Sequence, residues 1–491
     1  MGATPYVLQL IRSIDNARIV EIGVAQAKSA VKYLSLPNVS EYIGVDPWQK
    51  YQQSPDPSFQ EGYLDRKMGL WQTDQDWEEV YQRACSRLEP FGDRARLIRA
   101  FSHQAVDQVD GDLDVVSIDG NHQFEYALRD MELWWDKIRP GGLMLLDDYD
   151  CHGGSIIGGR FGGRKACQVD LACEAFCKAR DLDWYVSQGQ ACIHKPHSEL
   201  ASLKDKHKGQ RCFIIGNGPS LNLTDLDLIA GEQTIAMNRI SLLYDRTSWR
   251  PSYYVYMSDN VDNPNWGEPW QQSVTQAVAC PQTTSFIWRR YAHAVHEPGN
   301  VIWLDSITEQ QIGTDGTFST NAAQYISKTG TTMNAALQLA FHLGFDPVII
   351  LGADLNWVTS GSDAKSDPNH FDPNYSARIP DGERERARMR ETHQRVREIF
   401  RSHGREIYNA TISTFLDTYP LVDYTWTVKH PDHRFGWRDQ ARLSVFCKRM
   451  RIWWYWAVQH KLARRNLTCR NFLPRLWGKL RRLGARAIRT R

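Results

Sequence analysis

The sequence contains no apolar run long enough to cross a membrane. Its longest aromatic-rich cluster, 452–458, has seven residues, whereas a membrane-spanning helix needs about 20. The first 18 residues lack the apolar core and the small-residue cleavage site of a secretory signal. These two absences predict a cytoplasmic protein.

The ten cysteines show no compact spacing and form no CxxC pair. Cys173 and Cys177 lie four residues apart in an amphipathic stretch, where small buried side chains are expected in any case. The pattern therefore predicts reduced structural thiols rather than a disulfide framework or a metal cluster.

Acidic residues are nearly absent from the C-terminal end. Residues 430–491 hold 17 lysines and arginines but only two acids, so this segment carries a charge of +15 and the rest of the chain −13. The composition is otherwise ordinary, with 42% hydrophobic and 24% charged residues, which excludes wholesale disorder. The 491 residues are too many for one core. We expect an acidic enzymatic body with a basic tail that binds an anionic surface.

Residues 1–195 alternate short β-branched runs with longer amphipathic stretches. Such alternation predicts a parallel sheet with helices on both faces. The predicted strands are 18–23, 42–46, 96–100, 114–119 and 143–147, and the clearest predicted helices are 74–88 and 123–137.

The same alternation restarts after a polar, lysine-rich stretch at 198–210. Its predicted strands are 211–215, 234–237, 251–257, 300–304 and 347–352, with helices at 333–343 and 381–403. The sequence therefore predicts an α/β fold with two Rossmann-like parallel-sheet domains in tandem and a basic helical tail. The predicted boundaries are 1–195 and 210–428 for the domains, 196–209 for the linker and 429–491 for the tail.

Several polar residues follow the predicted strands of the first domain. In a doubly wound sheet the carboxyl ends of the strands share one crevice, so Asp46, Ser102, Asp119 and Asp147 should rim it. The carboxylate of Asp46, at the tip of the second strand, lies at the right distance to accept hydrogen bonds from two ribose hydroxyls. Gly23 opens the tight turn after the first strand, where the backbone would approach a ligand.

This domain resembles class I S-adenosylmethionine-dependent methyltransferases, particularly the subgroup with IDGxH after the fourth strand. The matching segments are VEIGVAQAKSA, IGVDPW, DVVSIDGNHQFEYALRDMELWWDKIRPGGLMLLDDYD and VDLACEAFCKARDLDWYVSQGQACIHK, which span most of 18–195. One departure is the family's glycine-rich first loop, in which Ala25 and Ala27 follow Gly23.

The resemblance implies roles for several residues. Glu21, Gly23 and Asp46 would bind S-adenosylmethionine, and His122 would be the general base for a hydroxyl acceptor. Asp119, Asp147 and Asp148 would form an oxygen-rich site for a divalent cation such as Mg²⁺. The alternative is that these acids are strand-end polar groups and helix caps, which lack a diagnostic metal spacing.

In the second domain a predicted buried strand runs into GNGPS. Two glycines there would let bare amides of Gly216 and Gly218 approach an anionic ligand, and Ser220 would cap the next helix. The turn is neither a Walker loop nor the usual dinucleotide fingerprint. Thr331 and Thr332 open another helix and predict a second amide-rich anion site.

The order of segments in 208–423 resembles a bacterial glycosyltransferase-like family that includes sialyltransferases and surface-glycan glycosyltransferases. The segments are FIIGNGPSL, TIAMN, YYVYMSD, GTTMNAALQLAFHLGFDPVIILGAD, HFDPNY and YNAT. The same segments also resemble a pterin-pyrophosphokinase-like group, in which the substrate would be ATP and a pterin-like alcohol.

The glycosyltransferase resemblance implies a nucleotide-sugar donor. His370 would be the base that deprotonates the acceptor, and Tyr375 would steady the leaving phosphate. Asp354 is either a ligand contact or a strand-end cap. The implied donor-binding residues are Gly216, Asn217, Gly218, Ser220, Asn238, Thr331, Thr332 and Asp354.

The tail combines cations with tryptophans at 448–456 and adds a second cationic stretch at 473–491. This composition favours peripheral binding of 448–491 to an anionic membrane on its inner face, or packing of the aromatic residues on the enzyme body. Nucleic acid is disfavoured because neither domain is basic. The joint expectation is a bifunctional transferase that glycosylates and O-methylates a sugar or glycan acceptor, and the alternative is a non-catalytic membrane-bound scaffold.

Overall fold

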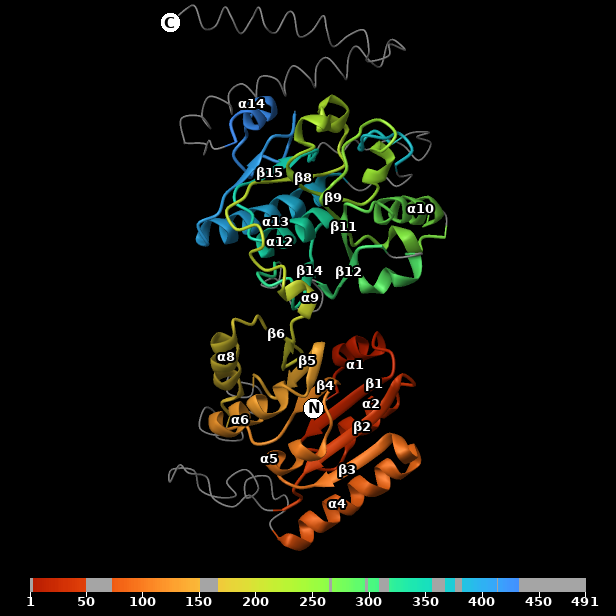
Figure 1. The fold of residues 1–491 in the computed structure, drawn as a ribbon. Coiled ribbons are helices and arrows are strands. Elements are labelled where there is room, and N and C mark those ends of the chain that lie inside the picture. Colours follow the sequence, from red (N-terminus) through yellow and green to blue (C-terminus); the bar gives the residue numbers. More distant parts are fainter. Residues whose placement is uncertain are drawn as a thin grey trace, which may run out of the picture.

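The computed structural model describes residues 3–49, 73–150, 167–264, 267–295, 299–308, 318–355, 367–375, 382–412 and 414–431. These residues form two α/β units, each built on a seven-stranded sheet (Figure 1). Within these ranges, no helix combines the length and the apolarity that crossing a membrane requires.

The first sheet has the strand order β3-β2-β1-β4-β5-β7-β6. Strands β1 to β5 are parallel, whereas β7 runs antiparallel to both β5 and β6. The strands are β1 (Ala17–Ile22), β2 (Val39–Asp46), β3 (Ala95–Arg99), β4 (Leu113–Ile118), β5 (Ile138–Leu146), β6 (Tyr185–Ser187) and β7 (Gln190–His194).

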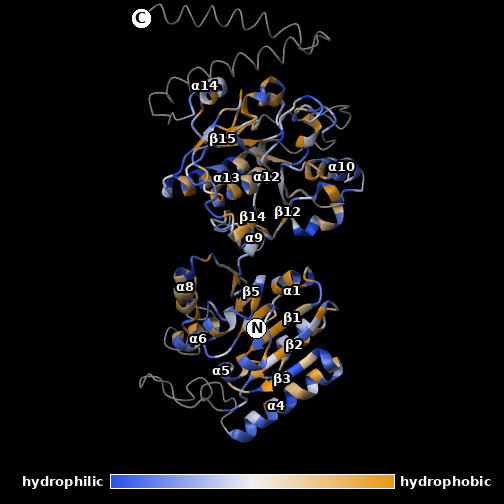
Figure 2. Ribbon diagram, in the orientation of Figure 1, coloured by the Kyte–Doolittle hydropathy of each residue, from blue (hydrophilic) through white to orange (hydrophobic). Residues whose placement is uncertain are grey.

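Helices cover both faces of this sheet and form two separate cores. One core includes residues of α6 and α8, and the other includes residues of α1, α2 and α4. The helices are α1 (Pro5–Arg12), α2 (Lys28–Leu34), α4 (Asp74–Leu88), α5 (Ser102–Ala105), α6 (Phe124–Trp135) and α8 (Val169–Arg180). Apolar residues gather on the strands and on the inner helix faces, as the amphipathic patterns predicted (Figure 2).

The second sheet is entirely parallel, with the order β12-β11-β10-β9-β8-β15-β16. A small two-stranded sheet of β13 and β14 lies beside it. The strands are β8 (Cys212–Ile215), β9 (Gln233–Met237), β10 (Tyr253–Tyr256), β11 (Thr284–Trp288), β12 (Val301–Leu304), β13 (Ser306–Thr308), β14 (Ile326–Lys328), β15 (Val348–Leu351) and β16 (Ile407–Asn409).

Helices also pack on both faces of the second sheet. Residues of α12 and α13 belong to one core, and residues of α10 and α14 belong to the other. The helices are α9 (Ser198–Ala201), α10 (Gly267–Val278), α12 (Thr332–His342), α13 (Gly382–Ser402) and α14 (Tyr424–Lys429). Short 3₁₀ segments are Glu89–Arg94, Val106–Gln108, Pro219–Leu223, Leu226–Ile229, Ile240–Leu243, Asp259–Asp262 and Arg289–Ala294.

The predicted linker is not a free tether. Leu200 is fully buried, and its carbonyl accepts a 2.8 Å hydrogen bond from His342 at the end of α12. The amides of Asp205 and His207 donate to carbonyls of His342 and Leu343. This stretch therefore belongs to the second unit, because its backbone hydrogen bonds are made there.

The two units meet through a glutamine that is completely buried. Gln324 accepts a hydrogen bond from the Asp183 amide (2.7 Å) and donates to the carbonyls of Asp183 and His194 (both 2.9 Å). His194 pairs with Leu143 in the middle of β5, on the side away from the carboxyl ends of the strands. The second unit thus contacts the first away from the predicted cofactor crevice.

Candidate functional site

At the carboxyl ends of β1 and β2, Asp46 connects the end of β2 to the loop that follows β1. This carboxylate is 8% exposed and accepts hydrogen bonds from the amides of Ala25 (2.9 Å) and Trp48 (2.7 Å). The indole of Trp48 donates to the carbonyl of Ala25 (2.9 Å), which closes the ring of contacts. Burial raises the pKa of Asp46, while the backbone amides oppose that shift. The acid is therefore fixed at the position where the sequence predicted a ribose contact.

In the first loop two alanines, Ala25 and Ala27, adopt positive φ values that favour glycine. Gly23, Ala25 and Ala27 have φ values of 87°, 45° and 57°, in the left-handed region that L-residues enter at a cost. At Gly23 a Cβ would overlap the carbonyl of Asp119. Close packing on the end of β4 therefore requires a glycine at this position, and the expected contact of Gly23 with the cofactor stays a prediction.

Glu21 points into the protein rather than into the crevice. It is fully buried and accepts hydrogen bonds from the hydroxyls of Ser29 and Tyr42. Burial raises the pKa of Glu21 to about 8, because the charged carboxylate is desolvated. The expected cofactor contact is therefore corrected to a structural role at the end of β1.

An acid–imidazole group lies at the ends of β4 and β5. Nε2 of His122 lies 3.4 Å from Asp119 and 3.8 Å from Asp148. Ligand atoms of these three residues lie within 4.8 Å of one another, close enough for one metal ion. Asp147 is buried and is not a member of this group. The structure thus keeps Asp119 and Asp148 of the predicted trio and replaces Asp147 by His122.

The carboxylates and the imidazole of this group shift one another's pKa values. Burial alone would lower the pKa of His122, but the neighbouring carboxylates of Asp119 and Asp148 raise it above its ordinary value. Burial raises the pKa of Asp119 to about 6, against the effect of His122. Such mutually shifted acid–base pairs are typical of active sites, although structural ion pairs produce them too.

Ser102 lies in the same crevice region and is tied to α6. Its hydroxyl accepts a 2.8 Å hydrogen bond from the indole of Trp134. It also interacts with Asp130, whose pKa burial raises to about 6. Sequence reasoning missed Asp130, because an acid inside a charged helix carries no separate signal.

One cysteine departs from the expectation of reduced thiols. Cys167 is disulfide-bonded, and its partner lies outside the described residues. The described free thiols are Cys85, Cys173, Cys177, Cys192, Cys212 and Cys280.

The glycines after β8 contact neighbouring backbone and a carboxylate. A Cβ at Gly216 would overlap the carbonyl of Gly352, and one at Gly218 would overlap the carboxylate of Asp354. The amide of Gly218 donates to Gly352 (2.8 Å), and that of Gly216 donates to the last residue of β15 (2.8 Å). Both glycines therefore serve the close approach of two loops.

Asp354 occupies the place that the sequence assigned to an anion. The amide and hydroxyl of Ser220 both donate to its carboxylate, at 3.1 and 2.6 Å. Burial raises the pKa of Asp354 to about 7. These hydrogen bonds correct the expectation that Gly216, Gly218 and Ser220 hold a phosphate, since their amides already have acceptors. Asn217 is buried beside them and donates to the Met237 carbonyl (3.2 Å).

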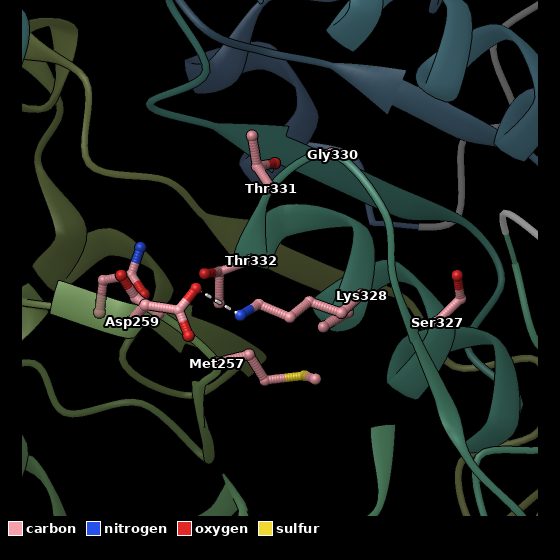
Figure 3. A pocket seen from close by; sticks show the side chains of 10 residues that line it. Met257, Asp259, Ser327, Lys328, Gly330, Thr331 and Thr332 are labelled. Carbon is pink, nitrogen blue, oxygen red and sulfur yellow. Dashed lines mark hydrogen bonds and ion pairs between the residues drawn. The ribbon is translucent and has the colours of Figure 1, made fainter. Parts of the chain in front are cut away.

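A cavity of about 250 Å³ lies at the ends of β9, β10 and β14. Three predicted residues line it: Asn238, which follows β9, and Thr331 and Thr332 at the start of α12, which Figure 3 labels. Its two charged lining residues, Asp259 and Lys328, form a 2.7 Å ion pair. Asp259 ends the YYVYMSD segment of the resemblance but was given no role, and sequence reasoning missed Lys328. The remaining lining residues are Met257, Ser258, Ser327, Gly330 and Ala335.

His370 and Tyr375 stack with ring centroids 3.9 Å apart. Asp367, also missed from the sequence, accepts a 2.7 Å hydrogen bond from Nδ1 of His370 and so orients the ring. Tyr375 is 2% exposed, and its hydroxyl accepts from the amide of Arg239 (3.5 Å). The expected contact of Tyr375 with a leaving phosphate is therefore corrected to a buried supporting role beside His370.

The predicted membrane-binding segment, 448–491, lies outside the described residues and stays a prediction. The described part of the chain ends shortly after α14, which passes the predicted domain boundary at 428 by one residue.

The N-terminal unit can be compared with known proteins. Residues 20–149 match the family model described as a methyltransferase domain. An uncharacterized protein of Sinorhizobium fredii is 24% identical over 149 residues, which cover 29% of this chain and 14% of that protein. An uncharacterized protein of Acanthamoeba polyphaga mimivirus is 21% identical over 140 residues, 28% of this chain and 52% of that protein. The chain thus covers less than two thirds of either relative.

Solved structures match this chain at lower sequence identity than these two relatives do. A putative caffeoyl-CoA O-methyltransferase from Staphylococcus aureus has 18% identity, a TM-score of 0.29, and coverage of 39% of this chain and 84% of its own. An O-methyltransferase from Bacillus cereus in complex with SAH has 15% identity, a TM-score of 0.27, and coverage of 39% and 82%. Likenesses at this level carry no functional argument. By the family match, residues 20–149 are similar to a methyltransferase domain.

Proposed function

We propose that the N-terminal unit, residues 1–195, transfers a methyl group from S-adenosylmethionine to a hydroxyl oxygen of a sugar or glycan acceptor. The observation that carries the proposal is the fixed carboxylate of Asp46 at the tip of β2. Backbone amides hold this carboxylate in place, and its remaining lone pairs would accept hydrogen bonds from a ribose hydroxyl. The family match at 20–149 supplies the reaction class.

His122 is the proposed base. S-adenosylmethionine, when bound, supplies an electrophilic methyl group. As the new carbon–oxygen bond forms and the sulfur–carbon bond breaks, Nε2 of His122 takes the proton that the acceptor hydroxyl loses. Asp119, 3.4 Å away, stabilises the imidazolium that results.

The same group fits a divalent cation. Carboxylate oxygens suit Mg²⁺, and the imidazole nitrogen of His122 would favour a transition metal instead. Asp119 and Asp148 are the residues that would hold Mg²⁺.

A calorimetric titration of the full chain with S-adenosylmethionine tests this part of the proposal. We expect one site per chain, and we expect His122→Gln to keep that site while losing methyl transfer to any accepted hydroxyl compound. Absence of both heat and thermal shift would overturn the assignment.

We further propose that residues 210–428 form a nucleotide-sugar glycosyltransferase, which makes the chain a bifunctional enzyme of glycan synthesis. The supporting observation is the cavity at β9 and β10, whose lining offers partners to a sugar or a ribose. Asn238 is one of the lining residues, and its buried Oδ1 has no hydrogen-bond partner among the described residues. A donor on a bound ligand would satisfy this atom. His370, oriented by Asp367, is the proposed base for the acceptor hydroxyl.

A nucleotide panel against the full chain separates the candidate activities. Preference for a pyrimidine nucleotide sugar supports glycosyl transfer. Preference for ATP with Mg²⁺ supports the pyrophosphokinase-like alternative. A chain that binds neither S-adenosylmethionine nor any nucleotide would be a scaffold.

Membrane binding by the basic tail is a separate proposal. We expect 448–491 to bind an anionic membrane, because each cation near such a surface contributes about 1 kcal/mol. Co-sedimentation of the full chain with phosphatidylserine vesicles, but not with phosphatidylcholine vesicles, tests this expectation.

A further inference from the structure

Among the residues that line the cavity of the second unit, Lys328 and Asp259 form an ion pair, in which the carboxylate side chain is 63% exposed. Lys328 ends β14, Asp259 follows β10, and the dashed line in Figure 3 joins the ammonium to the carboxylate at 2.7 Å. Lys328 is the one cation among the residues that line the cavity. Its side chain is 23% exposed, so a charge is held there at the expense of its hydration.

Other groups allow the ion pair to open without leaving Asp259 alone. The hydroxyl of Tyr291 also donates to Asp259. Arg290 acts electrostatically on Asp259 as well. The ammonium of Lys328 lies 4.3 Å from the ring centroid of Trp288, which also stabilises the cation. The remaining acid that acts on Lys328 is Asp262.

The amino end of α12 also lines the cavity. Thr331 is the N-cap residue of this 11-residue helix, and its side chain makes no hydrogen bond to the first helical amides. The start of a helix carries partial positive charge, so this end of the cavity favours an anion. Lys328 lies only three residues before it in the chain.

The loop after β8 is less favourable for an anion than the cavity is. Its amides at Gly216, Gly218 and Ser220 donate to protein acceptors, and the carboxylate of Asp354 faces them. A phosphate placed there would meet an acid and few free donors. The cation and the uncapped helix end are both in the cavity instead.

We propose that Lys328 is the phosphate-binding residue of the second unit, and that its ammonium passes from Asp259 to the phosphate of a nucleotide at the amino end of α12. The inference rests on the proposed nucleotide-sugar function and assigns its phosphate subsite. A cavity of 250 Å³ is smaller than the 300 to 1,000 Å³ range that holds drug-sized ligands. It therefore holds the phosphate and ribose, and the transferred sugar lies outside it.

Paired titrations isolate the phosphate contribution. The full chain is titrated by calorimetry with cytidine and cytidine monophosphate, and likewise with the uridine and adenosine pairs. We expect one monophosphate to bind more tightly than its own nucleoside. Lys328→Met should remove between roughly 10- and 100-fold of the affinity for the monophosphate, the range of a hydrogen bond to a charged group, and leave the affinity for the nucleoside unchanged.

Two further variants serve as controls. Lys328→Arg keeps a cation and should retain most of the affinity. Lys204→Met removes another lysine of an ion pair, the exposed one with Asp181, and should change nothing. Circular dichroism of each variant checks that the fold is intact.

The outcomes distinguish this inference from the proposed function. If the wild-type chain binds a nucleoside and its monophosphate equally, or if Lys328→Met binds both as the wild type does, the assignment of Lys328 is wrong while nucleotide recognition stands. If no nucleotide binds but inorganic pyrophosphate binds the wild type and not Lys328→Met, the anion site stands and the nucleotide-sugar function falls. Binding of neither overturns both.

Discussion

The carboxylate of Asp46 accepts a 2.9 Å hydrogen bond from the amide of Ala25, which ties the end of β2 to the loop that follows β1. The same carboxylate accepts from Trp48 at 2.7 Å. Because two amides fix its orientation, the side chain of Asp46 would lose little conformational entropy on binding a ribose. Its position is the strongest structural support for a cofactor crevice in the first unit.

Replacing this acid by its amide separates cofactor binding from folding. Asp46→Asn keeps one oxygen acceptor but loses the charge and one acceptor site. We expect the affinity for S-adenosylmethionine to fall by about 10- to 100-fold, since hydrogen bonds to charged groups are worth about 1.5–3 kcal/mol. Calorimetry measures the change. Glu41→Gln, on the same strand in an outer ion pair with Arg18, is the control and should bind normally.

A glycine should stabilise the first loop. Ala25 has φ 45° and is only partly buried, so Ala25→Gly relieves backbone strain and removes little buried surface. We expect the free energy of unfolding to rise by about 1 kcal/mol. Ala179→Gly, at an exposed position in α8, should lower it by roughly 0.5–1 kcal/mol. Urea unfolding compares the two, and equal losses would contradict the strain argument.

The buried Glu21 predicts a pH dependence of stability. Unfolded, its carboxyl ionises near 4.5, but the folded protein keeps the proton up to about pH 8. Between these values the folded state binds more protons, so the free energy of unfolding falls as pH rises. A shift of this size corresponds to a loss of up to roughly 4 kcal/mol by pH 8.

Glu21→Gln removes this titration. The variant should show a flatter stability profile from pH 5 to 8 and should gain on the wild type toward pH 8. The other buried carboxyls are the same in both proteins, so the difference between the two profiles isolates Glu21. Parallel profiles would show that this carboxyl is ionised in the folded state.

Removing Gln324 should weaken the junction of the two units. Gln324→Ala leaves the amide and carbonyl of Asp183 and the carbonyl of His194 without that partner. We expect a loss of roughly 2–4 kcal/mol and a split of the unfolding endotherm into two transitions. Gln82→Ala, on the exposed face of α4, should leave the endotherm unchanged. A single unshifted transition in Gln324→Ala would contradict this role.

Most of the fold follows from hydrophobic periodicity. The predicted helix 74–88 coincides with α4 because Thr73 caps it and an apolar stripe repeats along it. The predicted strands at the centres of both sheets agree with β1, β2, β4, β8 and β15 within a few residues. Short strands such as β6, β13 and β14 were not predicted, since three residues carry no period and pairing partners decide their conformation.

The site was less predictable from the sequence. A glycine or a polar residue after a strand shows the same sequence pattern whether it contacts a ligand or packs against another loop. Asp46 and Asn238 lie where the sequence placed them, at strand ends that face a crevice or a cavity. Gly216 and Gly218 instead pack against the loop after β15, a partner more than a hundred residues away. Lys328 was missed because β14, the strand that it ends, has only three residues and is too short to be predicted from the sequence.

Hydrogen exchange of the full chain, with and without S-adenosylmethionine, tests whether the first unit binds this cofactor at the ends of β1 and β2. We predict slower exchange of the backbone amides in 23–27 and 46–48, where the cofactor would cover the first loop and the end of β2. Exchange that is unchanged throughout 1–195 at saturating cofactor would contradict it.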